Sequence, residues 1–375
     1  MDNLKYISLL LNDIYEKKYI VYKNERLKSI NFINIVDTFL NKYLLFNKDS
    51  IKLSSSVMKK LYGGSYLRYI EYLIEKDFIY LYKNYSVGNK SKCYKLTNTS
   101  KNIGYLSVNI QMPKKLLNKL EIINTNLNMV DEYIKNKLIS DLYSVNINLD
   151  KSLEWINENI KDIKAKFINE TTCNKIYKKD LYYSFDNYGR FHTNFTILKK
   201  EIRNKYLKID NENIKEIDIS NSQPFFLYLL MKEKGFVNFE GFDNDVLSGK
   251  IYEKILNNSS EKITRKEAKI NVYSILFGRT LTKNYWHKLF NNLYPSVYEW
   301  ISNYKKENKN YKIIAQQLQS LESNFMFKKL IPNIINKNSN IKIITIHDSV
   351  IVQEQYYEDV KFIFLNSLTD LISNN

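Results

Sequence analysis

The sequence predicts an α+β protein in which helices dominate and short strands form small antiparallel sheets. Apolar residues recur at the spacing of an amphipathic helix over several long stretches of the chain. Two short runs, Lys215–Ser220 and Ile341–Val352, are instead rich in β-branched residues, which is typical of strands. Only 4 Pro and 9 Gly interrupt 375 residues, so we expect helix-rich structure with few flexible linkers.

The composition predicts a folded protein with a polyanionic partner. Hydrophobic residues make up 44% and charged residues 26% of the chain, as in folded soluble proteins. Lys and Arg number 57 against 40 Asp and Glu, which leaves a net charge of +17. Such an excess favours nucleic acid over a membrane as the partner, although an AT-rich coding sequence would also raise the lysine content.

Cysteine content and hydropathy indicate where the protein acts. Cys93 and Cys173 are too few for a disulfide framework or a zinc site, which suits a reducing compartment. The sequence contains no signal peptide and no apolar run long enough to span a bilayer. We therefore expect a cytoplasmic protein with no membrane partner.

Residues 1–104 are expected to form a separate module. Helical spacing covers Leu4–Tyr15 and Ile30–Phe46, and serines stand where two further helices would begin. The other expected elements are helices over Val57–Leu61 and Ser65–Glu75, a break at Gly63–Gly64, and strands at Ile79–Tyr82 and Cys93–Leu96 around Gly88–Lys90. Helix, turn, helix and hairpin follow one another in a winged-helix fold.

Basic residues of this module are candidate DNA contacts. Arg68, Lys90 and Lys92, with Lys59 and Lys60, would meet phosphates if the module docks as winged helices do on DNA. The alternative is that the module contacts a protein and that these side chains form a solvated face.

Two aspartates on separate strand candidates suggest a metal site. Asp218 lies within the first β-branched run, and Asp348 lies between the two halves of the second. Paired carboxylates of this kind can hold two Mg²⁺ ions, which stabilise the attacking and leaving oxygens of a phosphoryl transfer. The alternative is structural: Asp348 closes a turn, and Asp218 caps the following helix.

A helix is predicted from Arg265 to Phe277, ended by Gly278. Arg265, Lys269, Tyr273 and Phe277 recur every four residues and therefore share one face. Two cations suit a triphosphate, and two aromatic rings suit a base and a sugar. An amphipathic helix with a core stripe and a solvated basic end would give the same pattern.

The order Asp218, Arg265-x3-Lys269-x3-Tyr273-x3-Phe277-Gly278 and His347-Asp348 resembles motifs A, B and C of family A DNA polymerases. It is also similar to the related phage-type single-subunit RNA polymerases. The segment Tyr188–Asn194 resembles a stretch that the DNA polymerases carry before motif A. The resemblance covers roughly residues 180–375, about half of the chain.

The resemblance implies a right-hand polymerase fold. Residues 176–375 would be a palm with an antiparallel sheet, and helical fingers would be inserted at about 231–324. The charged helical patterns Leu116–Ile139 and Leu153–Phe167 would make residues 105–175 a reduced thumb, with a helical spacer as the alternative. No segment resembles a proofreading exonuclease.

The resemblance also implies roles for residues at the active site. Asp218 and Asp348 would hold two Mg²⁺ ions, for which Mn²⁺ is a possible substitute. Arg265 and Lys269 would contact the triphosphate, and Tyr273 would lie near the sugar. Phe277 would lie beside the templating base, where the family has tyrosine.

Four further residues would meet the DNA or select the nucleotide. Arg190 would reach the minor-groove edge of the primer terminus, His347 would lie by the primer end, and Gln319 would lie near the template strand. Gln223 stands five residues after Asp218, where the DNA polymerases place a glutamate that excludes the ribose 2′-hydroxyl and the RNA polymerases have glycine. A side chain of this size favours deoxynucleotides.

The sequence therefore predicts a template-directed DNA polymerase that lacks proofreading and replicates a plasmid, phage or mobile element. Its partners would be a DNA primer-template, dNTPs and replication proteins. A single-subunit RNA polymerase or primase-like enzyme is the alternative, because Ser349 follows Asp348 as in the RNA polymerases. A second alternative is a winged-helix DNA-binding replication protein whose polymerase-like half is degenerate.

Overall fold

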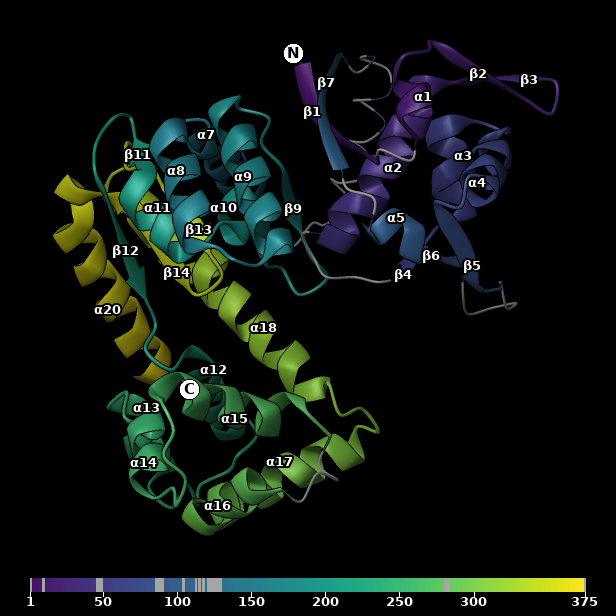
Figure 1. The fold of residues 1–375 in the computed structure, drawn as a ribbon. Helices are drawn as coiled ribbons and strands as arrows, with labels where there is room; N and C mark the ends of the chain where they lie inside the picture. The colour runs from purple at the N-terminus through teal and green to yellow at the C-terminus, as the bar shows by residue number, and fades with distance from the viewer. Residues whose placement is uncertain are drawn as a thin grey trace. The chain divides into compact units, whose positions relative to one another are not determined.

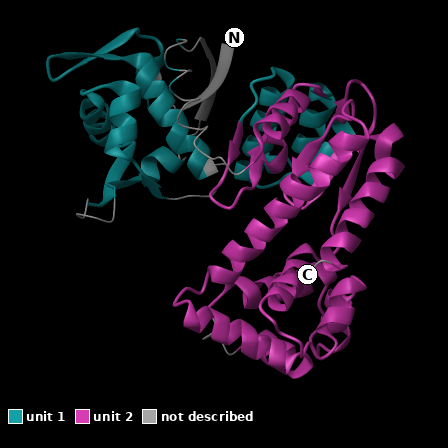
Figure 2. Cartoon of the chain, turned by 180° about the vertical axis from the view of Figure 1, so that it is seen from behind, with its two compact units in different colours: residues 1–126, 146–182, 197–206 teal, residues 127–145, 183–196, 207–375 magenta. Residues whose placement is uncertain are grey.

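The computed structural model describes residues 2–8, 11–44, 50–84, 91–102, 105–111, 113, 116, 119, 130–279 and 284–373. It is the mixed α+β structure that the sequence predicts, with many helices and small antiparallel sheets (Figure 1). The chain forms two compact units (Figure 2). Unit 1 comprises residues 1–126, 146–182 and 197–206, and unit 2 comprises 127–145, 183–196 and 207–375. No helix among the described residues is long and apolar enough to cross a membrane.

Unit 1 begins with a series of short elements. They are β1 (Asp2–Ser8), α1 (Asn12–Tyr15), β2 (Tyr19–Tyr22), β3 (Glu25–Lys28), α2 (Ser29–Leu44), β4 (Ser50–Lys52), α3 (Ser55–Tyr62), α4 (Tyr66–Glu75), β5 (Ile79–Lys83), β6 (Cys93–Leu96), α5 (Asn98–Asn102) and β7 (Tyr105–Gln111). Its later parts hold α8 (Leu149–Asn159), α9 (Ile163–Tyr177) and α11 (Lys200–Tyr206). The single helix expected over Leu153–Phe167 is thus two helices, because Asp162 accepts a hydrogen bond from the Ala165 N–H and starts a new one.

The elements from α2 to β6 pack around one core. Helix, strand, helix, helix, strand and strand follow in order, and the strands form a sheet in the order β4-β6-β5. Phe32, Phe39, Leu73 and Phe78 are fully buried among them. The expected helices at 57–61 and 65–75 and the two strands are confirmed, and the helix expected at 30–46 is confirmed up to Leu44, since residues 45–46 lie outside the described residues. Strand β4 was not foreseen.

The expected helix Leu4–Tyr15 is wrong. Residues 2–8 form β1, which pairs antiparallel with β7 from Asp2 opposite Gln111 to Ser8 opposite Tyr105, and only Asn12–Tyr15 is helical. The strand depends on hydrogen bonds to a partner about one hundred residues away, which helical apolar spacing cannot reveal. This pairing also carries unit 1 past the boundary expected at residue 104.

Unit 2 contains most of the long helices. Its elements are α7 (Glu132–Leu142), β9 (Tyr183–Phe185), β10 (Phe191–Thr193), β11 (Leu207–Ile209), β12 (Ile214–Asp218), α12 (Ser222–Glu233), α13 (Phe242–Leu247), α14 (Ile251–Asn257), α15 (Arg265–Phe277), α16 (Tyr285–Leu293), α17 (Pro295–Glu307), α18 (Ile313–Phe325), the π-helix η2 (Met326–Leu330), α19 (Ile331–Lys337), β13 (Ile344–Ile346), β14 (Ser349–Gln353), the 3-10 turn η3 (Glu354–Tyr356) and α20 (Tyr357–Ser373). Two elements cross the boundary between the units, namely β8 (Val145–Ile147) and α10 (Asn194–Ile197).

The centre of unit 2 is the antiparallel sheet β12-β14-β13. Both β-branched runs form strands as predicted, and β14 lies between the other two with all five of its residues buried. Helix α20 lies along this sheet, and α18 extends from it toward the group of helices α12 to α17 (Figure 1). A central strand buried on both faces holds its neighbours rigidly, which fixes the residues at its ends.

A buried ion cluster joins α7 to the segment just before β13. Asp141 is fully buried, and its carboxylate is bound by Lys137, by Lys342 at 3.6 Å and by the Ile343 N–H at 3.0 Å. Lys137 also donates to the Ile341 carbonyl oxygen at 2.8 Å. Residues 117–118 and 120–129 of the expected helix Leu116–Ile139 lie outside the described residues, and its later part is helical from Glu132 as α7.

Candidate functional site

The two aspartates predicted to act together meet at one end of the β12-β14-β13 sheet. Asp218 is the last residue of β12 and lies opposite Ser349, the first residue of β14. Asp348 lies in the turn that directly precedes Ser349, so the two aspartates lie at the same end of the sheet. Burial raises the pKa of Asp348, and the negative charge of Asp218 raises it further. The Ser222 hydroxyl and the Lys269 ammonium oppose this shift, so groups from three other elements act on Asp348.

The two-residue turn that carries Asp348 is held in place by its neighbours. His347 adopts a left-handed φ of 53°, which is uncommon for a residue other than glycine. The Ser349 hydroxyl oxygen lies 3.0 Å from Oε1 of Glu216 on β12 and 3.1 Å from the Ile346 carbonyl oxygen. These contacts join the turn to the strand that carries Asp218.

Helix α15 has the bounds that the sequence predicts, and both of its ends are fixed. Thr264 forms a capping box with Glu267 at the start of the helix. At the other end, Lys305 is only 3% exposed, and its Nζ donates to the carbonyl oxygens of Ile275 at 2.7 Å and Gly278 at 2.8 Å. A cation suits the negative end of the helix dipole, although burial lowers the pKa of Lys305 to about 8.

Arg265, Lys269, Tyr273 and Phe277 all lie on α15, as predicted, but the two cations among them have different surroundings. Lys269 is exposed, and its Nζ lies 5.4 Å from the centroid of the Tyr273 ring. The ring centroids of Tyr273 and Phe277 are 5.3 Å apart. Arg265 instead pairs with Glu253 of α14, with Nε 2.6 Å from Oε1. Lys269 therefore lies beside the Tyr273 ring, whereas the charge of Arg265 is offset by a carboxylate.

Tyr252 is a site residue that the sequence did not reveal. It is 1% exposed on α14, and the Arg265 guanidinium carbon lies 5.1 Å from its ring centroid. Burial raises the pKa of Tyr252, with the Tyr273 hydroxyl as the next cause. Burial also raises the pKa of Tyr273 to about 12, and the charges of Asp348 and Glu322 add to this shift. Nothing in the local sequence around Tyr252 distinguishes it from an ordinary buried tyrosine.

The turn between β9 and β10 presents Arg190. Oδ1 of Asp186 accepts hydrogen bonds from the N–H groups of Tyr188 at 2.8 Å and Arg190 at 3.1 Å. Gly189 has a φ of 81°, in the left-handed region that favours glycine. The Tyr188-Gly189-Arg190 sequence is therefore explained by the turn, which aims the Arg190 side chain away from the hairpin.

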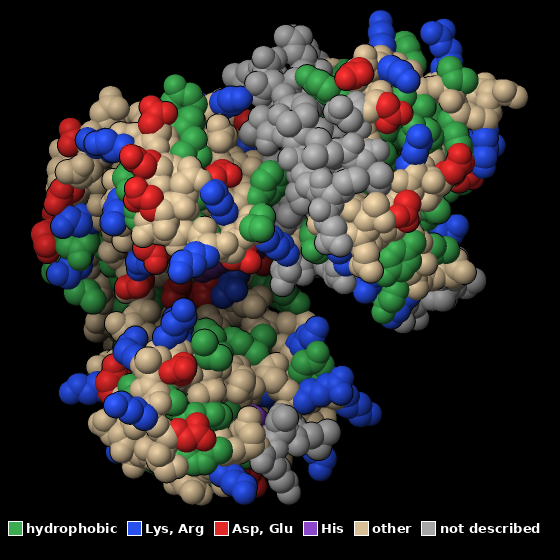
Figure 3. All heavy atoms as spheres, viewed as in Figure 1, with side chains coloured by type: hydrophobic (Ala, Val, Ile, Leu, Met, Phe, Trp, Pro, Cys, Tyr) green, Lys and Arg blue, Asp and Glu red, His purple; other side chains and the backbone are tan. Residues whose placement is uncertain are grey.

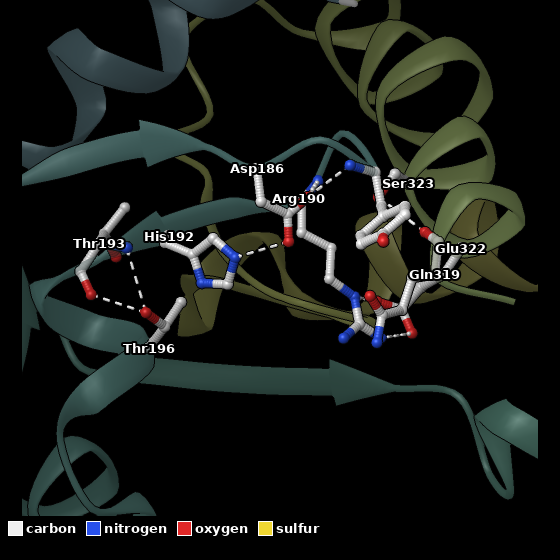
Figure 4. Close-up of polar contacts among 9 residues, drawn as sticks. Asp186, Arg190, His192, Thr193, Thr196, Gln319, Glu322 and Ser323 are labelled. Atoms are coloured by element: carbon white, nitrogen blue, oxygen red, sulfur yellow. Dashed lines mark hydrogen bonds and ion pairs between the residues drawn. The ribbon is translucent and has the colours of Figure 1, made fainter. Parts of the chain in front are cut away.

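Arg190, Glu322 and Gln223 form a buried polar cluster, of which Figure 4 shows the Arg190–Glu322 pair. Nε and Nη2 of Arg190 donate to the two carboxylate oxygens of Glu322 at 2.8 and 2.7 Å. Nε2 of Gln223 donates to Oε2 of Glu322 at 2.7 Å. Glu322 is 1% exposed, and burial raises its pKa to about 7 while Arg190 opposes the shift. A carboxylate in an ordinary helical pattern is usually exposed, so the burial of Glu322 is a finding of the structure.

The same hairpin brings two histidines together. Nε2 of His192 lies 3.0 Å from Oδ2 of Asp186 (Figure 4), and the ring centroids of His192 and His347 are 5.6 Å apart. His347 is thus placed by a second imidazole as well as by its own turn. A role for it beside a primer end stays a prediction.

The remaining predicted residues lie next to this cluster, elsewhere in the two units, or outside the described residues. Gln319 precedes Glu322 by one turn of α18, and its carbonyl oxygen accepts a hydrogen bond from the Ser323 hydroxyl at 2.9 Å (Figure 4). In unit 1, Arg68 pairs with Glu25 at 3.0 Å and with Glu71 at 2.8 Å.

Lys92 of unit 1 is exposed just before β6. Lys90 lies outside the described residues. In unit 2, Glu354 is half-exposed and pairs with Lys215 at 3.2 Å.

Asp218 and Asp348 are suitable ligands for Mg²⁺. They supply hard carboxylate oxygens at one end of a rigid sheet, and Mg²⁺ is usually bound through one or two carboxylates with water and phosphate oxygens completing its shell. The charge repulsion that raises the pKa of Asp348 would be relieved by a cation between the two groups. Among the described residues, no group of three or more His, Cys, Asp and Glu side chains forms a closed metal site.

The site thus joins two adjacent carboxylates, a nearby lysine, a pair of aromatic rings and a buried Arg-Glu-Gln cluster, all within unit 2. In comparisons with known proteins, no family model and no curated protein matches the chain.

Proposed function

We propose that the protein is a template-directed DNA polymerase that adds deoxynucleotides to a primer 3′ end. One observation carries the proposal: Asp218 and Asp348 lie at the same end of the sheet, and the charge of Lys269 acts on Asp348. Phosphoryl transfer needs this combination, because carboxylates hold the metal ions and a cation meets the triphosphate.

Each residue would have a defined part in the reaction. The primer hydroxyl attacks the α-phosphorus of the nucleotide, a new P–O bond forms, and the bond to the β-phosphate breaks to release pyrophosphate. Divalent ions, when bound, activate the hydroxyl and neutralise the leaving group. Asp218 and Asp348 would hold these ions, and Lys269 would stabilise charge on the phosphates. Tyr273 and Phe277 would contact the sugar and base.

The architecture of unit 2 supports a right-hand arrangement. The β12-β14-β13 sheet would be the palm, and the helices from α12 to α18 would be the fingers. In unit 1, the order α2, β4, α3, α4, β5, β6 with the sheet order β4-β6-β5 supports a winged-helix module. Residues 105–175 would supply the thumb.

An RNA polymerase or primase-like activity is the second candidate. Ser349 stands where the DNA polymerases have a glutamate, and its hydroxyl contacts Glu216. Gln223, in contrast, is a bulky residue at the position that would face the sugar, which favours deoxynucleotides.

The test is extension of a labelled DNA primer on a DNA template with Mg²⁺, with dNTPs and rNTPs compared. Extension should occur with dNTPs and disappear in Asp218→Asn and Asp348→Asn. Asp359→Asn, an exposed carboxylate of unit 2 on α20, is the matched control and should extend normally. Extension with rNTPs alone would establish the second candidate. Activity that survives both substitutions would refute polymerase chemistry at this site.

A further inference from the structure

The outer face of the β4-β6-β5 sheet in unit 1 exposes aromatic side chains. β5 is an edge strand, and four of its five residues are exposed. Tyr80 is 43% and Tyr82 45% exposed, and Tyr80 lies opposite Lys95 on β6. The register shifts at a bulge between Leu81 and Lys83, so alternation along the strand does not by itself place Tyr82. Lys95, which lies opposite Tyr80, has its Nζ 4.1 Å from the Tyr82 ring centroid, so both tyrosines lie beside the same lysine on the exposed side of the sheet.

Lysines surround these rings, and carboxylates are absent from the strands. Nζ of Lys95 lies 4.1 Å and Nζ of Lys83 lies 5.2 Å from the Tyr82 ring centroid. The three strands also carry Lys52, and their described residues include no Asp or Glu. The face therefore combines flat aromatic surface with positive charge.

On helix α4, in contrast, the cation Arg68 is paired with carboxylates. Arg68 is bound by Glu25 and Glu71, and Glu71 also pairs with Lys23 at 3.0 Å. Paired cations attract phosphate weakly, since neighbouring carboxylates offset their field. In Figure 3, Lys and Arg side chains are spread over the face viewed, so charge alone does not single out one surface. The β4-β6-β5 sheet adds a pair of exposed tyrosines on one strand, Tyr80 and Tyr82, with Lys83 and Lys95 beside them.

We propose that the outer face of the β4-β6-β5 sheet binds single-stranded DNA. Bases would stack on Tyr80 and Tyr82, and phosphates would lie near Lys83 and Lys95. Base faces are open to an aromatic side chain only when the strand is unpaired, so the face selects single strands over duplex. The inference rests on the proposed function and extends it: unit 1 would hold unpaired template.

The test measures binding of a fluorescent oligo(dT) to full-length protein carrying Asp348→Ala, so that nucleotide addition cannot affect the result. The double variant Tyr80→Ala/Tyr82→Ala should weaken this binding by about tenfold or more, as loss of base stacking does. Affinity for a blunt duplex should change less than about twofold. Tyr15→Ala removes a tyrosine of unit 1 that is equally exposed, at 43%, and should leave both affinities unchanged.

A second pair of variants tests the lysines and the type of strand. Lys83→Gln/Lys95→Gln should reduce the dependence of oligo(dT) affinity on salt, because fewer counterions are released on binding. Tyr82→Phe keeps the ring and should bind like the parent. An unchanged oligo(dT) affinity in the tyrosine double variant, an equal loss for duplex, or tighter binding of oligo(rU) than oligo(dT) would overturn the proposal. Thermal unfolding of each variant shows that the fold is intact.

The two proposals fail separately. Tyrosine-dependent binding of oligo(dT) without any primer extension by the unsubstituted protein would refute the polymerase and leave the binding face. Primer extension with tyrosine-independent binding would refute the binding face alone.

Discussion

The guanidinium of Arg190 and the carboxylate of Glu322 form a two-point ion pair between residues that lie 132 positions apart in the sequence. Glu322 is almost completely buried, and Gln223 donates a third hydrogen bond to the same carboxylate. One buried group on α18 thus positions the residue expected at the primer terminus and the residue expected to exclude ribonucleotides. Contact between Arg190 and the minor groove stays a prediction. It would require the guanidinium to contact DNA while it is paired with Glu322, or after it leaves that carboxylate.

Replacing Glu322 with leucine should destabilise unit 2. The substitution removes the carboxyl that accepts hydrogen bonds from Arg190 and Gln223, and it leaves the Arg190 side chain, which is only 17% exposed, without that partner. Breaking a buried pair on one side costs about 3 kcal/mol in the free energy of unfolding. Chemical denaturation measures this cost. The double variant Arg190→Met/Glu322→Leu should lose less than the sum of its single substitutions, and full additivity would show that the two residues act independently.

The free energy of unfolding should depend on pH because of Glu322. Burial raises the pKa of this carboxyl from 4.5 to about 7, so between these values the folded state binds more protons than the unfolded state. Stability then falls as pH rises from 4.5 to 7, because the slope follows the protons bound in the unfolded state minus those in the folded state. The difference between unsubstituted protein and Glu322→Gln, measured by denaturation across this range, isolates the effect. A pH-independent difference would contradict it.

Local signals in the sequence were sufficient for the elements that carry the catalytic candidates. Helix α15 has its capping box and terminal glycine in adjacent residues, and the hairpin of β13 and β14 is marked by β-branched residues on both sides of His347 and Asp348. Each of these patterns is complete within about fifteen residues, so tertiary contacts did not overrule it.

Residues that act through distant partners could not be predicted in this way. Glu322 lies in an ordinary helical pattern, and its burial follows from packing against Arg190 and Gln223. Tyr252 gains its place from Arg265 and Tyr273 on a separate helix. A single sequence contains these residues but not the contacts that give them their surroundings.

Replacing the buried Lys305 should increase the flexibility of the C-terminal end of α15, although Lys305 is not one of the residues expected to contact the nucleotide. Lys305→Met leaves the carbonyl oxygens of Ile275 and Gly278 without their donor, which costs roughly 1–3 kcal/mol. Amide hydrogen exchange at residues 274–278 should become faster. The KM for the nucleotide should rise more than kcat falls, because Tyr273 and Phe277 lie on the last turn. Lys306→Met, an exposed lysine next in sequence, is the matched control and should change neither quantity.

Gln223 should set the choice between deoxynucleotides and ribonucleotides. It is 6% exposed near the start of α12, and its amide is fixed by Glu322, so its bulk cannot turn aside for a 2′-hydroxyl. Gln223→Ala should raise the kcat/KM for an rNTP relative to the matching dNTP by about tenfold or more, since removing a steric clash favours the larger substrate. Gln319→Ala, on α18 one turn from Glu322, should leave the ratio unchanged. An unaltered ratio in Gln223→Ala would assign sugar selection to another residue, with Tyr273 the first to test because its ring lies on the face expected to meet the sugar.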